Sequence, residues 1–233
     1  MKQSLLAICL ILLISFSLFA QKNEPIKVKA GTRLTDYFEP NERYLYPDFI
    51  NGKAKFRNGK TYRCRFNYNF LSGEMEFIEK KDTLTIIDKN ELLSIVIKQD
   101  TFYYENGYLQ QIQNGFIKVY SKQFIKLKDI QKKGAMGTIN RSSATESIKY
   151  WQSGSLSYDL ISDTDIILQK EEQFFFSLSQ NNFTLFNRSN LFALLPWKKA
   201  DLKSYIKSNK INFKSKKDVL ELANYINQFL AKK

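Results

Sequence analysis

Alternating apolar and polar residues, interrupted by turn signals, run from Ile50 to Ile130 and constrain the fold more than any other feature of the chain. The clearest segment is TYRCRFNYNF (61–70), in which every second side chain is aromatic or cysteine and the others are Thr, Arg or Asn. A period of two is typical of a half-buried antiparallel strand. Asn58-Gly59, Ser72-Gly73 and Asn106-Gly107 are turn pairs between such segments.

This pattern predicts a mainly β (α+β) chain, in which an antiparallel β-meander forms a sandwich or a curled half-barrel over residues 21–190. Within it, residues 131–148 contain glycines and hydroxyl residues without apolar periodicity, so we expect a loop there. From 191 to 233 the apolar period becomes helical. We expect two lysine-rich C-terminal helices to pack on the sheet, the last one opening on a capping sequence, Ser215 to Asp218.

The first twenty residues, MKQSLLAICLILLISFSLFA, read as a secretory signal peptide. Lys2 provides the positive start, an apolar run follows, and the segment ends on the small residue Ala20. The run is shorter than the roughly 20 apolar residues that span a bilayer. We therefore expect cleavage after Ala20 and no transmembrane segment in the mature chain, with an uncleaved anchor as the alternative.

Histidine is absent from the whole chain, which excludes the commonest general base and the commonest zinc ligand. Of the two cysteines, Cys9 lies in the signal, so Cys64 alone remains and no intramolecular disulfide is possible. Cys64 falls in the alternating pattern and is interpreted as a small buried hydrophobe rather than a reactive thiol. The sequence predicts no metal site, no cofactor and no enzymatic activity.

The formal net charge is +13, and its excess is concentrated near the C-terminus, where ten lysines stand against three acids from Lys198 to Lys233. Outside the cytoplasm such a surface is suited to anionic lipid, an acidic glycan or an acidic envelope protein rather than to nucleic acid. The alternative is a solvated helix surface that aids solubility. The candidate basic surface consists of Lys198, Lys199, Lys203, Lys207, Lys214, Lys216 and Lys217.

Consecutive aromatic residues cannot all face one side of a strand, so some of them point away from a one-sided core. Phe174, Phe175 and Phe176 form one such run, Tyr103 and Tyr104 another, and Trp151 follows Tyr150 beside the expected loop. Two covered faces would explain these runs by core packing alone. The alternative is a ligand groove lined by Phe and Tyr, so these six residues (Phe174, Phe175, Phe176, Tyr103, Tyr104 and Trp151) are the candidate ligand-binding set.

Carboxylate pairs offer weaker candidates. Glu74 and Glu76 alternate with apolar residues on one strand, so we expect both to face water rather than to form an acid–base pair. Asp163 and Asp165 lie between expected strands and could contribute to a calcium site, but two carboxylates fall short of the six to eight oxygens that calcium takes. A simple turn is the favoured interpretation.

The signal ending in Phe-Ala-Gln, the strands NGKAKFRNGKTYRCRFNYNF and DTFYYENG, and the closing segment DLKSYIKSNKINFKSKKDVLELANYI resemble the small exported β-rich proteins of Bacteroidota-type bacteria. This resemblance implies a location in the periplasm or envelope of a Gram-negative-type bacterium, without a known activity. A looser architectural similarity is to periplasmic curled-sheet carriers of lipoproteins. The leading expectation is thus a non-enzymatic exported protein that acts by binding or structural interaction; the alternative is a carrier of lipid or another hydrophobic ligand.

Overall fold

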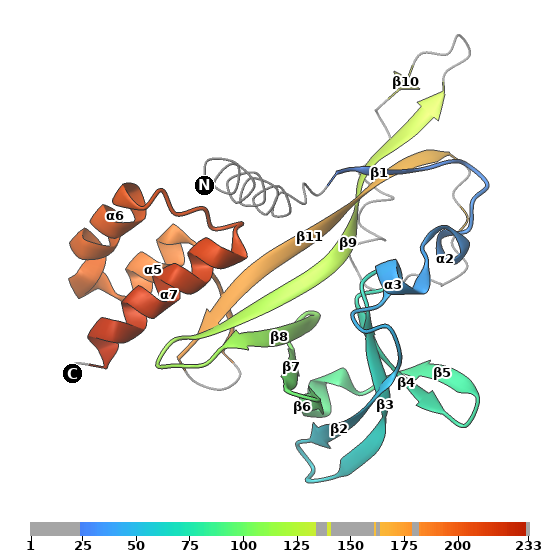
Figure 1. Cartoon of the computed structure of the whole chain (residues 1–233), viewed down its shortest axis with the longest axis horizontal. Helices are drawn as coiled ribbons and strands as arrows, with labels where there is room; N and C mark the ends of the chain where they lie inside the picture. The colour runs from blue at the N-terminus through green and yellow to red at the C-terminus, as the bar shows by residue number, and fades with distance from the viewer. Residues whose placement is uncertain (1–23, 134–138, 141–160, 162–163, 179–181, 232–233) are drawn as a thin grey trace, which may run out of the picture.

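The structure is a computed structural model that describes residues 24–133, 139–140, 161, 164–178 and 182–231. The expected signal peptide, Trp151 and most of the expected 131–148 loop lie outside the described residues. The described chain is one continuous, unclosed antiparallel sheet with helices at its C-terminal end, which confirms the mainly β fold class. It curls as a single sheet, so the curled form applies rather than the sandwich (Figure 1).

The sheet has the order β1-β11-β9-β8-β7-β6-β2-β3-β4-β5, with β12 paired to β11 and β10 to β9. Neighbouring strands are joined mostly by the hairpin turns that the sequence predicts, and all pairs are antiparallel. The strands are β1 (Ile26–Val28), β2 (Ile50–Phe56), β3 (Thr61–Asn69), β4 (Glu74–Glu79), β5 (Asp82–Thr85), β6 (Leu92–Ile97), β7 (Asp100–Tyr104), β8 (Tyr108–Gln113), β9 (Lys118–Lys133), β10 (Ile139–Asn140), β11 (Asp165–Ser177) and β12 (Thr184–Leu185).

Two one-turn helices precede the meander and three longer ones follow it. They are α2 (Leu34–Tyr37), α3 (Pro40–Arg43), α5 (Arg188–Leu194), α6 (Lys199–Ser208) and α7 (Lys216–Leu230), with short 3₁₀ turns η2 (Lys89–Glu91) and η3 (Pro196–Lys198). The sequence predicts α6 and α7 but not α5 as a separate helix. Asn187 caps α5 by accepting the Asn190 N–H at 2.8 Å, a cap that is readable in the sequence.

The strands β9 and β11 form a long ribbon that reaches from one end of the molecule to the other (Figure 1). Residues 131–133, expected to begin the loop, continue β9: Gln131 pairs with β11, and Lys132 and Lys133 pair with β10, so the loop prediction is wrong for that part. Alternation in the sequence predicts two separate strands at 166–169 and 173–178. The structure has one strand there, β11, because the polar residues 170–173 pair with β9 instead of turning.

Two hydrophobic clusters lie along this ribbon. The first fills the curl of the sheet and includes Phe66, Tyr68, Phe102 and Tyr108, together with Leu127 of β9. The second lies between the ribbon and the C-terminal helices; its sheet residues are Ile117, Val119, Phe174 and Phe176, and its helix residues include Leu202, Ile206, Val219, Leu222, Ala223 and Ile226. The predicted apolar stripe of α7 thus packs on the sheet (Figure 1).

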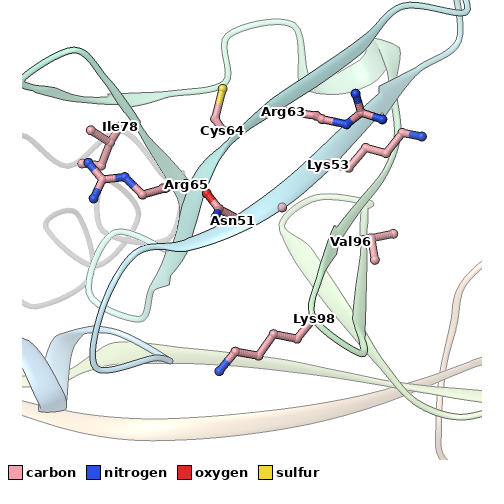
Figure 2. A pocket seen from close by; sticks show the side chains of 9 residues that line it. Asn51, Lys53, Arg63, Cys64, Arg65, Ile78, Val96 and Lys98 are labelled. Carbon is pink, nitrogen blue, oxygen red and sulfur yellow. The ribbon is translucent and has the colours of Figure 1, made fainter.

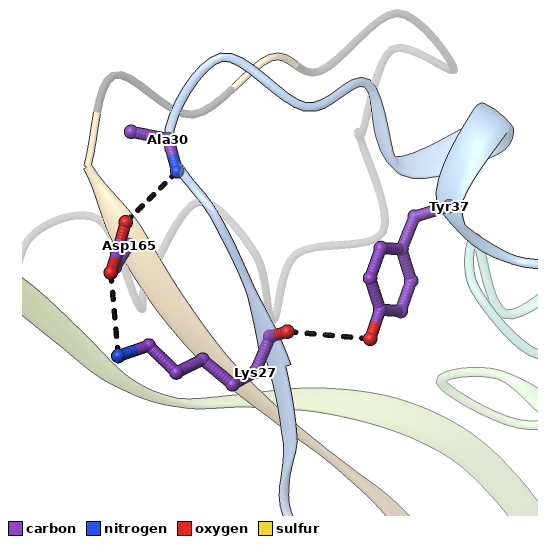
Figure 3. A network of polar contacts seen from close by, with 4 residues as sticks. All are labelled: Lys27, Ala30, Tyr37 and Asp165. Carbon is purple, nitrogen blue, oxygen red and sulfur yellow. Dashed lines mark hydrogen bonds and ion pairs between the residues drawn. The ribbon is translucent and has the colours of Figure 1, made fainter.

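The edge strand β1 is fixed by side-chain contacts at the start of β11 (Figure 3). The Asp165 carboxylate accepts the Ala30 N–H at 3.0 Å and lies 3.4 Å from the Lys27 Nζ. The Tyr37 hydroxyl donates to the Lys27 carbonyl at 3.3 Å. Asp165 is therefore the first residue of β11, where its carboxylate has protein partners, rather than a member of a turn. Asp163 lies outside the described residues.

Side-chain amides join α7 to the sheet, and besides the bond from Gln113 of β8 to Asn224 Oδ1 at 2.7 Å the main contact is Asn227. The Ile117 N–H donates to Asn227 Oδ1 at 2.8 Å, and Asn227 Nδ2 donates to the Ile117 carbonyl at 3.3 Å, so Asn227 pairs with the β8–β9 connection as a neighbouring strand would. Gly115 leaves room for this contact, because a Cβ there would lie 2.5 Å from Asn227 Nδ2. The helical layer is thus attached by directional bonds as well as by its apolar face.

We expect Asn227→Ala to lower the free energy of unfolding by roughly 1–3 kcal/mol, because it leaves the backbone groups of the buried residue Ile117 without their amide partner. Thermal and urea unfolding followed by circular dichroism would measure the loss. Gln228→Ala, at the next and solvent-exposed position of α7, is the matched control and should stay within about 0.5 kcal/mol of the parent. Equal losses in both variants would contradict the role of Asn227.

Candidate functional site

An open groove of about 700 Å³ lies on the outer face of the sheet, across β2, β3, β4 and β6. Strand register explains its lining. Arg65 lies between Asn51 of β2 and Ile78 of β4, and Lys53 lies between Arg63 of β3 and Val96 of β6. Lys98 follows the last residue of β6 and completes the lining together with Gly52 and Cys64.

Four cationic side chains therefore gather in one groove, and none of its lining residues is acidic. Lys53 and Arg63 are direct cross-strand partners, an arrangement in which like charges repel. In the described part of the chain, neither of them nor Arg65 has an ion pair or a side-chain hydrogen bond, and Lys98 contacts only the ring of Tyr46, at 6.0 Å. Among the described residues, these charges lie together without an ion-pair partner.

The side chains that line the groove point in different directions (Figure 2). Lys53 and Arg63 extend side by side from their paired strands, whereas Arg65 points the opposite way beside Ile78 and Lys98 extends away from them at the end of β6. Arg63, Arg65 and Lys98 are exposed, whereas Lys53 is half-buried. The groove therefore offers two guanidinium groups, two ammonium groups and the amide of Asn51 to a ligand in solvent, with apolar surface from Ile78 and Val96 at its sides.

Glycine is required at the base of the groove. A Cβ on Gly52 would lie 2.8 Å from the Val96 carbonyl oxygen and 2.9 Å from Phe66 Cδ2. These contacts are too short for any side chain, so β2 lies closely against its paired neighbour β6 and against Phe66 at this point.

The candidate ligand-binding aromatics do not meet at one site. Phe174 and Phe176 are buried in the cluster beneath the C-terminal helices, while Phe175 is half-buried and pairs with Leu185 of β12. Tyr103 packs with Tyr120 and Phe183 on one face of the sheet. Tyr104 packs with Tyr108 on the other face. Trp151 lies outside the described residues.

None of the five described members of that set lines the groove or a second, small cavity in the fold. That cavity is enclosed by Tyr68, Phe102, Tyr108 and their neighbours and measures about 10 Å³, enough for about one water molecule. A pocket for a drug-sized ligand measures roughly 300–1,000 Å³. Among the described residues, the paired aromatic runs are accounted for by packing on both faces of the sheet.

The candidate basic surface is distributed over the C-terminal helices. Lys199, Lys203 and Lys207 are exposed along α6, and Lys198, at its N-cap, pairs with Asp201 at 2.9 Å. Lys214, Lys216 and Lys217 are exposed around the start of α7, where Ser215 caps the helix by accepting the Asp218 N–H. These lysines belong to the helical layer, whereas the groove lies in the β-meander, so the structure separates two cationic regions.

Glu74 and Glu76 are inside the fold, and the expectation that both face water is wrong. Glu76 is fully buried, and its carboxylate accepts the Tyr44 hydroxyl and the Asn69 amide, each at 2.8 Å. Glu74 accepts the Lys89 ammonium at 2.5 Å, and its second oxygen has no hydrogen-bond partner among the described residues. Strand alternation predicted exposure of these side chains. That prediction fails because residues 44–49 and the η2 turn cover this end of the outer face of the sheet.

The surroundings of these acids shift the pKa values of Glu74 and Tyr44. Burial raises the pKa of Glu74, the ammonium of Lys89 opposes that shift, and the nearby charge of Glu76 adds to it. Burial and the Glu76 carboxylate raise the pKa of the Tyr44 phenol to about 12. These contacts hold the β3–β4 hairpin against the segment that contains Tyr44 and against the η2 turn, so the cluster has a structural role.

Other reactive groups are few in the described residues. Cys64 is half-buried against the core, and burial, followed by the charge of Glu79, raises its thiol pKa, which disfavours the nucleophilic thiolate. No group of three or more Cys, Asp or Glu side chains in the described ranges could hold a metal ion. Within the same ranges, no helix has the length and apolarity needed to cross a bilayer.

Sequence reasoning identified the polar face of β3 but did not single out the groove. Arg63 and Arg65 were readable as a cationic face; their neighbours Asn51, Lys53 and Lys98 lie 10 to 35 residues away and meet them only through strand pairing. The register of the Asn58-Gly59 hairpin was the available signal, since a short turn places Lys53 opposite Arg63.

We expect the stability of the protein to fall with rising pH relative to a Glu74→Gln variant. The raised pKa of Glu74 means that the protonated form favours the folded state. The associated stabilisation is present below the ordinary pKa of 4.5 and is lost as pH rises through the higher folded value. Urea unfolding of both proteins between about pH 4 and 7 would measure the difference. Glu91→Gln, at an exposed acid, should follow the parent, and parallel curves for Glu74→Gln and the parent would contradict the assignment.

Comparison with known proteins completes the description of the site. No family model matches the chain, and neither a curated protein nor a solved structure is similar enough to it to count as a match.

Proposed function

We propose that this chain is a non-enzymatic protein, exported to the periplasm or envelope of a Gram-negative-type bacterium, that binds an anionic ligand in the groove formed by β2, β3, β4 and β6. The observation that carries the proposal is the juxtaposition of Lys53, Arg63, Arg65 and Lys98 without an acid in the lining. Export rests on the N-terminal signal pattern, and the non-enzymatic role rests on the missing histidine.

Energetics support binding rather than a purely structural role for these cations. A direct cross-strand pair of like charges destabilises a sheet, and burying part of Lys53 adds to that cost. An anion between the two side chains would turn this repulsion into attraction, and guanidinium groups suit phosphate, sulfate or carboxylate because they donate paired hydrogen bonds. Ligand binding should therefore stabilise the fold.

The shape of the groove indicates the kind of ligand. It is open to solvent and has apolar surface from Ile78 and Val96 beside the cations. An anionic group attached to a sugar ring or a short hydrocarbon would contact both kinds of surface. The alternative role, a carrier that encloses a hydrophobic ligand, is less well supported, because the internal cavity among the aromatic residues measures about 10 Å³.

We expect pyrophosphate to raise the melting temperature of the parent protein at constant ionic strength and to leave an Arg63→Gln/Arg65→Gln double variant unchanged. A ligand at 100 times its Kd stabilises a protein by about 2.7 kcal/mol, which corresponds to a shift of several degrees. Differential scanning fluorimetry and isothermal titration calorimetry would measure the effect. Without ligand, the double variant should be at least as stable as the parent, because a repulsive pair is removed.

The matched control for this experiment is Lys214→Gln/Lys216→Gln, which removes two charges at exposed positions of the helical layer. This control should keep the full pyrophosphate response. An equal response in both double variants would show that net charge, rather than the groove, binds the anion. No response in the parent to pyrophosphate, citrate or heparin oligosaccharide would overturn the proposed function.

A further inference from the structure

A stripe of three lysines runs along the exposed side of α6. Lys199, Lys203 and Lys207 are four residues apart, so they lie on one side of the helix and are exposed. The opposite side carries Leu202 and Ile206, which are 0% and 2% exposed in the second hydrophobic cluster. The helix is therefore held with its lysine side towards solvent.

The three lysines lower the stability of α6 when nothing is bound to them. Like charges four residues apart on a helix destabilise it, and a lysine at the first position of the helix also opposes the helix dipole. Within the described chain, Lys199, Lys203 and Lys207 have no acidic partner, and the one ion pair of this region, Lys198 with Asp201, leaves them out. Between Pro196 and Lys217 the sequence has eight lysines and one acid.

An exposed tryptophan lies at the N-terminal end of the stripe. Trp197 belongs to the η3 turn directly before α6 and is 59% exposed, unusual for so large an apolar side chain. Tryptophan has an apolar body and an N–H donor, a combination enriched where proteins meet the interfacial region of a bilayer. The ring of Phe192 lies 5.9 Å from the Lys199 ammonium and adds aromatic surface nearby.

The surface is presented on a rigid support. Tyr205 of α6 stacks on Tyr225 of α7 with centroids 3.9 Å apart and planes 13° apart, and its hydroxyl donates to Glu221 at 3.2 Å. The Lys198 ammonium lies 5.8 Å from the ring of Phe229. Because α7 is bonded to the sheet through Asn227, the lysine stripe and Trp197 keep a fixed orientation relative to the β-meander.

We propose that this surface, formed by Trp197, Lys199, Lys203 and Lys207, docks the protein on an anionic phospholipid bilayer. Positive charge without partners complements the negative surface of such a membrane, and each lysine near it strengthens binding roughly five-fold. The exposed tryptophan favours a bilayer over a soluble anion, since its ring gains from the interfacial region. This docking is peripheral and independent of the anion groove, which lies in another part of the fold.

The test measures binding of the mature chain to vesicles of equal parts phosphatidylglycerol and phosphatidylcholine. Trp151→Phe leaves Trp197 as the one tryptophan, because the chain has two. We expect co-sedimentation with these vesicles, a blue shift of Trp197 emission, loss of both with added salt, and no binding to pure phosphatidylcholine. Lys199→Gln/Lys203→Gln/Lys207→Gln should weaken binding on the order of a hundredfold, since three lysines act together.

Two further variants separate the stripe from total charge and from folding. Lys29→Gln/Lys60→Gln/Lys81→Gln removes three other exposed lysines and should keep binding within about five-fold of the parent. Lys199→Arg/Lys203→Arg/Lys207→Arg keeps the charge and should restore binding. Equal weakening by both glutamine variants, unchanged emission of Trp197, or binding of polyglutamate or heparin in place of vesicles would each overturn the membrane assignment. The groove variant Arg63→Gln/Arg65→Gln should bind vesicles normally, so failure of one proposal leaves the other standing.

Discussion

The pairing of β9 with β11 is the interaction on which the rest of the structure depends. Thirteen residues of β11, Asp165 to Ser177, are in register with β9, with one shift at Ile167/Leu168. One end of this ribbon contributes Leu127 and Leu168 to the core of the curled sheet, and the other contributes Val119 and Phe176 to the core beneath the helices. Neither cluster is complete without the ribbon, because a sheet face or a helix stripe must be buried against another element.

The ribbon also explains why both faces of the sheet carry large side chains. Helices cover it at one end, and the curl of the meander covers it at the other. Consecutive aromatics such as Phe174, Phe175 and Phe176 are then a consequence of two-sided packing. The face of β2, β3 and β6 that carries Lys53 and Arg63 is different, since in this region cations project into an open groove.

The burial of polar groups is likewise explained by the segments that cover them. Asn67 is 1% exposed, accepts the Tyr46 N–H at 3.1 Å and donates to the Tyr46 carbonyl at 2.8 Å. Asn69 and Glu76 bond to each other in the adjacent position. These groups are buried because the segment before β2 crosses the outer face there, and each has protein partners, as buried polar groups require. Arg63 and Arg65, on the same face of the same strand, lie beyond that cover and remain in solvent.

Local pattern was enough to predict much of the fold. Alternation and the turn pairs predicted the strands β2 to β9 and their antiparallel hairpins, and the apolar stripe with Ser215 predicted α7, because strand period, turn chemistry and helix caps depend on neighbours in sequence. A simple meander would place β6 beside β5, whereas the structure pairs β6 with β2 and leaves β5 at the edge. The same reasoning failed where distant segments meet. It placed Glu74 and Glu76 in water, divided β11 into two strands and treated 131–133 as loop, since each outcome depends on a partner strand or a covering segment.

The same distinction between local pattern and tertiary contact applies to the candidate sites. The sequence by itself determined that the chain has no histidine chemistry, that positive charge is concentrated in the C-terminal segment, and that β3 has a cationic face. Only the tertiary structure decided which cations meet. Strand register brought Lys53 beside Arg63, the pairing of β2 with β6 placed Lys98 in the lining of the same groove, and burial of Leu202 and Ile206 fixed which side of α6 faces solvent. The physical reason is that composition and period are local properties, whereas juxtaposition is set by pairing and packing between segments far apart in the chain.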